Sequence, residues 1–453
     1  MCARRHSWLV LICLLASLVP NSIAHGQSWL SDRKRAEGRG LRFGDLEFHP
    51  GVGAEVGYLT NPFYSENPKG AFALRVAPHL YVSTLRDERQ EHDTTQVKQG
   101  WIAFQGGVSA TLQKYFDDDI NTAFNLDLSG DATIAPDRPV SVRITELLRR
   151  SGVPFGDSAT SPTFAGQAAL AQRANTDFGN WYETAGATLQ LQSPGGLLRG
   201  SLGYRFGYAW FDSSEFSYNN NLTHSALLNL GWEFLPKTAL FYDASFALQD
   251  YSHPDRSPAT ALVDNRQITT RLGVNGAITS QIAATIAVGY AAGFYDSFQA
   301  RGSTTAQQGD EFEGLIGNVE VRYTPTATSE LSLTFDRGFL SSYQGNFQER
   351  NRIFARTRLL LVGALLLGAR AGVEFLTFGR DLQQQDRSRN DVRYFADVSG
   401  EYRFIDWLAV TAQFSVLVDN TDFVYRFDRS LMLNDNRAEF TALEGWLGVR
   451  AFL

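Results

Sequence analysis

Apolar residues recur at every second position from Leu240 to Leu248, and polar or small residues fill most of the positions between them. Successive side chains of a β-strand point to opposite faces, so this alternation predicts a strand with one apolar and one polar face. The same two-residue period returns along most of the chain from residue 46 onward. We therefore expect an all-β protein built from many similar strands.

Eighteen segments of this kind can be placed along the chain. The better defined ones are residues 46–58, 71–83, 101–115, 121–134, 181–192, 198–211, 222–234, 239–251, 266–278, 282–296, 315–324, 330–344, 351–361, 364–379, 391–404, 408–420 and 438–453. The weakest is residues 139–150, where Leu147 and Leu148 interrupt an alternation that begins at Val140. An even strand number is what bacterial single-chain transmembrane barrels require.

The connections between these segments fall into two alternating sets. One set is short and rich in Gly, Pro and polar residues, as tight hairpins require: residues 193–196, 236–237, 280–281, 325–329 and 405–406. The other set is longer and polar: residues 151–180, 212–221, 252–265, 297–314, 380–390 and 421–437. This sorting predicts a transmembrane antiparallel β-barrel with short periplasmic turns and long extracellular loops. The alternative, a large secreted all-β protein such as a propeller, lacks the fixed repeat length that it needs.

The two faces of the predicted strands differ in chemistry. In residues 391–404, Tyr394, Val398 and Tyr402 share one face, whereas Arg393 and Arg403 share the other with Asp397, Ser399 and Glu401. A bilayer tolerates extended chain only in a closed barrel, with apolar residues toward lipid and polar residues toward the lumen. Apolar residues also alternate to Leu453, which predicts that the last strand closes the barrel against the first.

The first residues have the features of a secretion signal. Arg4 and Arg5 precede an apolar stretch from Trp8 to Val19, and small residues follow near residue 24. We therefore expect a cleaved signal peptide at residues 1–26, a periplasmic leader at residues 27–45 and a transmembrane barrel at residues 46–453.

Loss of this signal also removes both cysteines, Cys2 and Cys13, so the mature chain is expected to have no disulfide or cysteine metal site. Loss of Arg4 and Arg5 takes the formal charge from −7 to −9, which argues against nucleic-acid binding. The longest later apolar run, Leu359–Ala369, is shorter than the roughly twenty residues that a membrane helix needs.

The predicted lumen carries many charges. The candidates for lining the pore and setting its selectivity are Arg352, Arg356, Arg358, Arg370, Glu374, Arg393, Asp397, Glu401, Arg403 and Arg450. Further inward charges are expected at Arg271, Arg322, Glu55, Glu320 and Glu444. Opposed charges across a water-filled pore tune which solutes pass. The alternative is that they only solvate a wide lumen and form cross-strand ion pairs that hold its shape.

Six of these arginines fall on residues 351–361, 364–379 and 391–404, which predicts a constriction or a contact with an acidic polymer. Phe354, Phe378 and Phe395 share the inward face, where they could stack on sugar rings or only pack under loops.

Enzymatic chemistry has weaker support in the sequence. His253 lies in a long loop near Asp250 and Asp255, with Ser252 before it, but such proximity along the chain is more often a solvated loop than a catalytic site. No spaced set of histidines and carboxylates predicts a metal, and no Gly-rich phosphate loop occurs. We expect no enzyme activity and no cofactor. The run Asp117–Asp119 could hold divalent cations that bridge lipopolysaccharide, although most such runs are solvated turns.

A local resemblance supports the barrel interpretation. Residues 31–64, SDRKRAEGRGLRFGDLEFHPGVGAEVGYLTNPFY, resemble the opening of an outer-membrane β-barrel porin family found in proteobacteria, including myxobacteria. The resemblance rests on Asp32–Arg35, Gly44–Leu46, His49–Gly51 and Asn61–Phe63, and beyond it only the alternating strands match. Some members of that family are associated with polysaccharide secretion as terminal outer-membrane channels. The resemblance thus implies a channel, with polysaccharide export machinery as a partner, and no catalytic residues.

The leading hypothesis is a porin-like channel, integral to the Gram-negative outer membrane, that passes hydrophilic solutes or a secreted polysaccharide. About eighteen strands enclose an interior wide enough for an aqueous channel unless loops plug it. The other hypotheses are a barrel enzyme that acts near His253, and a plugged barrel that serves as an anchor or adhesin. The expected partners are outer-membrane lipid and lipopolysaccharide. An oligomer is compatible with the sequence, although no strand shows an interface.

Overall fold

A computed structural model describes residues 40–64, 66, 68–84, 101–118, 120–136, 138–152, 179–252, 263–298, 307–308, 311–342, 347–379, 389–425 and 436–453. The expected signal peptide, most of the expected leader, most of the loop at residues 151–180 and His253 lie outside these ranges. Within the described residues, no helix is long and apolar enough to cross a membrane.

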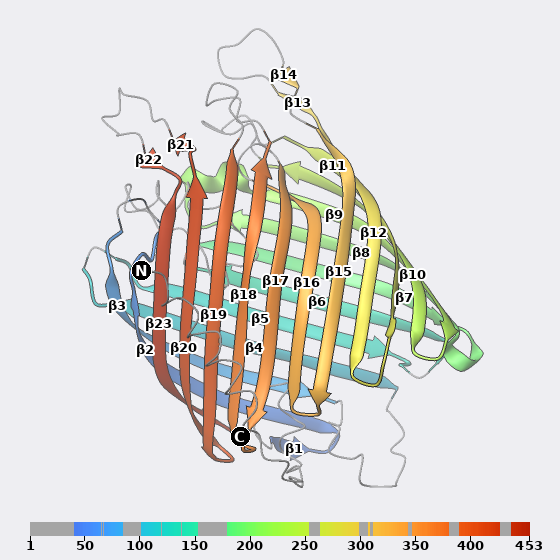
Figure 1. The fold of residues 1–453 in the computed structure, drawn as a ribbon, viewed down its shortest axis with the longest axis horizontal. Coiled ribbons are helices and arrows are strands. Elements are labelled where there is room, and N and C mark those ends of the chain that lie inside the picture. The colour runs from blue at the N-terminus through green and yellow to red at the C-terminus, as the bar shows by residue number, and fades with distance from the viewer. Residues whose placement is uncertain are drawn as a thin grey trace, which may run out of the picture.

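The described chain forms a closed antiparallel barrel of eighteen strands (Figure 1). The strands are β2 (Leu46–Leu59), β3 (Ala71–Ser83), β4 (Ile102–Tyr115), β5 (Ala123–Ile134), β6 (Val140–Ser151), β7 (Asn180–Gln192), β8 (Leu198–Phe211), β9 (Asn221–Leu235), β10 (Thr238–Tyr251), β11 (Asn265–Ala277), β12 (Ile282–Tyr295), β15 (Phe312–Thr326), β16 (Ser329–Ser341), β17 (Phe347–Leu361), β18 (Leu365–Phe378), β19 (Asn390–Ile405), β20 (Leu408–Thr421) and β23 (Phe440–Phe452). The prediction of eighteen strands is confirmed, including the weakest one.

The first and last strands close the barrel. β2 pairs with β23 from Gly51 opposite Phe452 to Leu59 opposite Glu444, and every other barrel strand pairs with its two neighbours in sequence order. Closure leaves no sheet edge, so the strands satisfy one another's backbone groups without water. In Figure 1 the yellow-to-red wall, β12 to β23, crosses in front of the cyan-to-green wall, β4 to β8, because the strands are tilted around the barrel.

The remaining elements are short. β1 (Leu41–Phe43) pairs with the start of β2 through a turn at Gly44, whose φ is 62°, so the last residues of the expected leader belong to the sheet. The hairpins β13–β14 (Ser297–Phe298 with Gln307–Gln308) and β21–β22 (Val424–Tyr425 with Asn436–Arg437) extend two long connections. Two 3-10 helices, η4 (Pro194–Gly196) and η5 (Ser214–Asn219), lie in connections.

The connections sort by length between the two ends of the barrel, as the sequence predicts. Tight turns join β9 to β10, β15 to β16 and β19 to β20 at one end, which we call the short-turn end. Longer connections join β10 to β11, β18 to β19 and β20 to β23 at the other, the long-loop end. One connection breaks the rule, because residues 84–101 join β3 to β4 at the short-turn end.

Each strand presents alternate residues outward and inward. Leu202, Val398 and Leu447 point outward and are more than half exposed, whereas inward Arg393 and Arg403 are buried. The apolar series from Leu240 to Leu248 also lies on the outward face, because it pairs in register with the outward residues of β9 and β11. An apolar exterior around a polar interior is the arrangement of outer-membrane barrels.

Glu146 is an exception to this sorting. It is the seventh residue of β6 and lies on the outward face, opposite Gly130 of β5 and Ala185 of β7. Its neighbour Leu147 points inward between Ser129 and Thr184. The weak alternation in this strand therefore comes from one inward leucine and one outward carboxylate, and not from a turn.

Candidate functional site

The register places the predicted charged residues on the inward face. Arg370 lies opposite Arg356 of β17 and Asp397 of β19, and Arg450 of β23 lies opposite Ala409 of β20. The ten candidates occupy β17 (Arg352, Arg356, Arg358), β18 (Arg370, Glu374), β19 (Arg393, Asp397, Glu401, Arg403) and β23 (Arg450). Most of them sit on one wall, from β17 to β19, and they differ greatly in what they contact.

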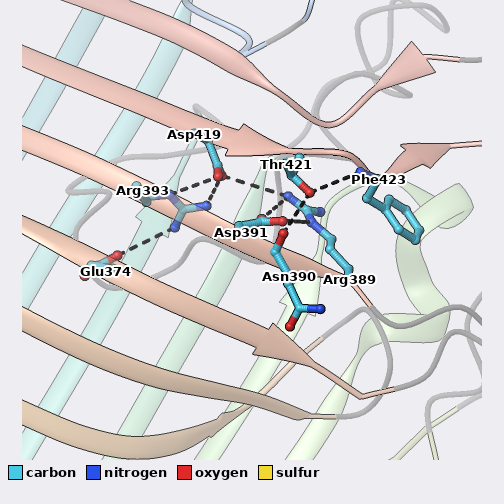
Figure 2. Close-up of polar contacts among 8 residues, drawn as sticks. All are labelled: Glu374, Arg389, Asn390, Asp391, Arg393, Asp419, Thr421 and Phe423. Carbon is cyan, nitrogen blue, oxygen red and sulfur yellow. Dashed lines mark hydrogen bonds and ion pairs between the residues drawn. The ribbon is translucent and has the colours of Figure 1, made fainter.

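Toward the long-loop end, eight charged side chains form one chain of alternating sign. We call it the ionic chain, and in order it contains Arg350, Asp336, Arg352, Glu374, Arg393, Asp419, Arg389 and Asp391. It crosses from β16 to β20, and Figure 2 shows its β18–β20 part. Four arginines face four carboxylates, so the ionic chain has no net charge.

The centre of the ionic chain is fully buried. Arg393 lies 3.8 Å from Glu374 and donates to Asp419, and all three side chains are 4% exposed or less. Arg389 donates to Asp391 at 2.8 Å and lies 3.9 Å from Asp419 (Figure 2). Removal of one partner from a buried ion pair leaves an uncompensated charge, which is costly in a low-dielectric interior. The ionic chain therefore holds this end of the wall together.

Other predicted arginines are paired as well. Arg370 donates to Asp397 at 2.7 Å, and Glu401 accepts from Arg403 at 2.8 Å and from Arg450 at 2.9 Å. The Arg403 guanidinium also lies over the ring of Phe452. These contacts are ion pairs of the kind expected if the charges hold the shape of the lumen, which is the alternative to a role in selectivity.

Arg356 and Arg358 differ from the rest of the wall. Both point into the lumen from β17 and both are exposed. Neither forms an ion pair or hydrogen bond with any described residue, whereas the other inward charges described from β16 to β20 are all paired. The six-arginine patch therefore reduces to two free cations near the middle and short-turn end of the wall.

The three inward phenylalanines have two different environments. Phe354 and Phe395 lie on either side of Gly372, with ring centroids 6.5 Å apart, and both are partly exposed. Phe378 is buried, with the Arg389 guanidinium 4.7 Å from its ring centroid. Only the first two rings therefore reach the lumen surface.

The hairpin β16–β17 leans into the lumen at the long-loop end. Pairing of β15 with β16 stops at Arg337, while β16 and β17 stay paired as far as Ser341. Beyond Arg337 the outward side of the hairpin packs on the inner wall: Phe339 stacks on Phe312 at 4.3 Å, and Ser341 bonds to Gln249 and Gln267. The adjoining ends of β16 and β17 thus occupy part of the lumen mouth.

Beyond the pair of strands that closes the barrel, β2 and β23, the lumen wall contains a cavity. A cavity of about 510 Å³ is lined by residues of β2 to β6 and β23, among them Tyr115, Asp127, Arg149 and Trp446. Arg75 at its rim pairs with Glu55, donates to Gln413 at 3.1 Å and covers the ring of Trp446. The interior therefore combines paired charges with open space.

Sequence reasoning missed several members of the ionic chain. Asp336, Asp391 and Asp419 lie at inward positions that strand period alone would have identified, whereas Arg350 comes just before the predicted segment at residues 351–361 and belongs to β17 in the structure. Arg389 lies in what the sequence predicts as a loop, so no strand period applied to it.

The other candidate sites are less developed. Asp117 forms an ion pair with Lys69 at 2.9 Å. His224 lies on the outward face, with its Nδ1 atom 2.6 Å from the Tyr204 hydroxyl. Among the described residues, no group of three or more His, Cys, Asp and Glu could hold a metal ion.

No protein-family model and no curated protein matches this chain. Several solved structures resemble its fold at low sequence identity. The outer membrane protein opdK of Pseudomonas aeruginosa is 9% identical, with a TM-score of 0.45, over 90% of this chain and 99% of that one. The OccAB2 protein of Acinetobacter baumannii is 10% identical, with a TM-score of 0.43, over 90% and 98%. The FrpB iron transporter of Neisseria meningitidis is 8% identical, with a TM-score of 0.44, over 92% and 82%.

Proposed function

We propose that this chain is an integral protein of the Gram-negative outer membrane and forms a channel through which hydrophilic solutes diffuse. The observation that carries the proposal is the closed eighteen-strand barrel with an apolar exterior and a charged interior. Barrels of sixteen to eighteen strands leave an aqueous channel, in contrast to eight-stranded barrels, which side chains fill. Solutes would enter past the ends of β16 and β17 and then follow the charged wall of β17–β19.

A secreted polysaccharide is the second candidate for the cargo. The observation that favours it is the pair of lumen rings, Phe354 and Phe395, beside the free guanidinium groups of Arg356 and Arg358. Flat rings next to cations suit sugar rings that carry acidic groups. The fold is equally compatible with small solutes, so the size of the permeating molecule is the quantity to measure.

A liposome-swelling assay tests the channel directly. Vesicles that contain the refolded barrel are diluted into isotonic solutions of neutral sugars of increasing size, from a pentose to a pentasaccharide. Rates that fall smoothly with sugar size are expected, because diffusion through a water-filled pore is limited by its width. Absence of swelling, from protein shown to be folded by its heat-modifiable electrophoretic mobility, would refute free diffusion and favour a plugged or partner-gated barrel.

The outward position of Glu146 gives a second test of membrane placement. Its replacement by leucine is expected to raise the free energy of unfolding in lipid vesicles by about 1–2 kcal/mol, because a carboxylate on the lipid face is unfavourable near the midplane. Urea unfolding followed by tryptophan fluorescence measures this, with Val142→Leu on the same outward face as an apolar control that should change little. A clear loss of stability in Glu146→Leu would instead mean that a protein partner covers this face.

A further inference from the structure

The free arginines lie within an ordered set of side chains on the lumen wall. Three rows run across β17, β18 and β19 in register: Phe354, Gly372 and Phe395; then Arg356, Arg370 and Asp397; then Arg358, Gly368 and Ser399. All nine residues face the lumen. Apolar rings therefore lie on one side of a cationic pair, and two small residues lie beside Arg358.

Neither of the two guanidinium groups has an ion pair or hydrogen bond with a described residue, so both are available to a ligand. The nearest carboxylates are not paired with them: Asp397 accepts from Arg370, and Glu330, opposite Arg358, forms its ion pair with Arg322 at 3.9 Å. Residues two apart on a strand are about 6.6–6.8 Å apart along it. Arg356 and Arg358 can therefore bind two separate acidic groups, or bind one acidic group from two sides. The fork of each guanidinium matches a carboxylate bidentately.

The ring pair depends on a glycine. A Cβ atom at Gly372 would lie 2.5 Å from the Cβ of Phe354 and 2.7 Å from the Cζ of Phe395, so any larger residue would push the rings away. The rings also contact cations, because the Arg352 guanidinium lies 4.7 Å from the Phe354 centroid and that of Arg370 lies 5.2 Å from the Phe395 centroid. The paired arginines thus fix the rings, and the free ones remain for the ligand.

We infer that Phe354, Phe395, Arg356 and Arg358 form a binding site for an anionic saccharide in the lumen wall. The rings contact the C–H face of a sugar, and the two guanidinium groups bind its carboxylates. The site rests on the proposed channel function for access of the ligand, and it adds a substrate class to that function. Because the ionic chain on the same strands has no net charge, the uncompensated cations described on β17–β19 are those of this site.

Arg205 provides a matched control variant. It also points into the lumen, from the middle of β8 on another part of the wall, and it is exposed with no ion pair or hydrogen bond to a described residue. Loss of Arg205 removes one lumen cation without touching the rings. A site that depends on local geometry and a lumen that depends only on total charge therefore respond differently.

The test is titration of trigalacturonate, with maltotriose as the neutral probe, in single-channel recordings. In the unmodified protein, trigalacturonate should interrupt the current at far lower concentration than maltotriose. The double variant Arg356→Ala/Arg358→Ala should raise the half-blocking concentration about a hundredfold or more, because it removes two sets of charge-assisted hydrogen bonds. Arg205→Ala should leave the half-blocking concentration within about twofold of the unmodified protein. Phe354→Ala/Phe395→Ala should weaken the block by trigalacturonate, because the rings contact the sugar, but should not weaken the block by free phosphate.

Calorimetric titration of the folded barrel in detergent separates this site from the channel. Binding of trigalacturonate that requires Arg356 and Arg358, in a protein that passes no current, would support the site and refute the diffusion channel. Current that trigalacturonate does not block, together with no binding of trigalacturonate, would support the diffusion channel and refute the site. An equal loss per cation removed, in Arg205→Ala and in the Arg356/Arg358 variant, would overturn the site in favour of diffuse lumen charge.

Discussion

Replacement of Asp419 by alanine is expected to lower the free energy of unfolding by about 3–5 kcal/mol, because it removes the partner of buried arginines. The Asp419 side chain is 0% exposed and contacts both Arg393 and Arg389, which are 4% and 2% exposed. With the carboxylate gone, the ionic chain carries one uncompensated positive charge in its buried centre, since four arginines then face three carboxylates. Urea unfolding in lipid vesicles, followed by tryptophan fluorescence, gives the measurement.

The matched control is Asp397→Ala, which removes the partner of Arg370 from an ion pair that is about one-third exposed. Partly exposed pairs contribute far less, so a loss of about 1 kcal/mol or less is expected. The variant Arg393→Met/Asp419→Leu should recover part of the loss seen in Asp419→Ala, since it removes both charges. Equal losses in Asp419→Ala and Asp397→Ala would show that burial does not set the strength of these contacts.

Replacement of Leu447 by arginine is expected to lower the free energy of unfolding by about 2–4 kcal/mol, the range for a cation on the lipid face near the midplane. Leu447 is the eighth residue of β23, points outward between Val56 and Ala412, and is 67% exposed in the isolated barrel. The same unfolding assay in vesicles applies. The loss should shrink in variants that place the arginine closer to either end of the strand.

The lumen control for this variant is Asn229→Arg. Asn229 lies in the middle of β9, points inward opposite Asp243 and is exposed. Its replacement by arginine should change the stability little, because the new cation meets water and a carboxylate. A large loss in Asn229→Arg with none in Leu447→Arg would reverse the two faces of the barrel and refute the membrane assignment.

The strands were predictable because strand period and facing are local properties. A two-residue period was enough to place eighteen strands and to assign Arg393 and Tyr394 to opposite faces. The weak segment at residues 139–150 was also a strand. Its alternation was weak because the adjacent apolar residues Leu147 and Leu148 point to opposite faces. Loop length marked the two ends of the barrel, except at residues 84–101.

The pairing of charges was not predictable from one strand at a time. Whether Arg370 or Arg356 receives Asp397 depends on the register of β17, β18 and β19, which the sequence period does not fix. For the same reason the sequence could not separate four neutralised arginines of the wall from the free pair. Arg389 escaped notice because it precedes β19 and reaches into the ionic chain from a connection.

The lean of the β16–β17 hairpin was also beyond a period argument. Strand period assigns Phe339 and Ser341 to the outward face of β16, yet both contact residues inside the lumen. The reason is that β16 leaves β15 after Arg337, which turns the outward side of the hairpin toward the inner wall of β10–β12. A contact between distant strands decides this, not the local pattern.

Single-channel conductance of the refolded, unmodified chain in a planar bilayer tests the central claim most directly. The proposed diffusion channel predicts large steps of uniform size whose current rises linearly with voltage, because ions then cross a water-filled lumen without a conformational change. Absence of current steps would contradict an open channel, provided that the protein has inserted and that its heat-modifiable mobility shows it to be folded.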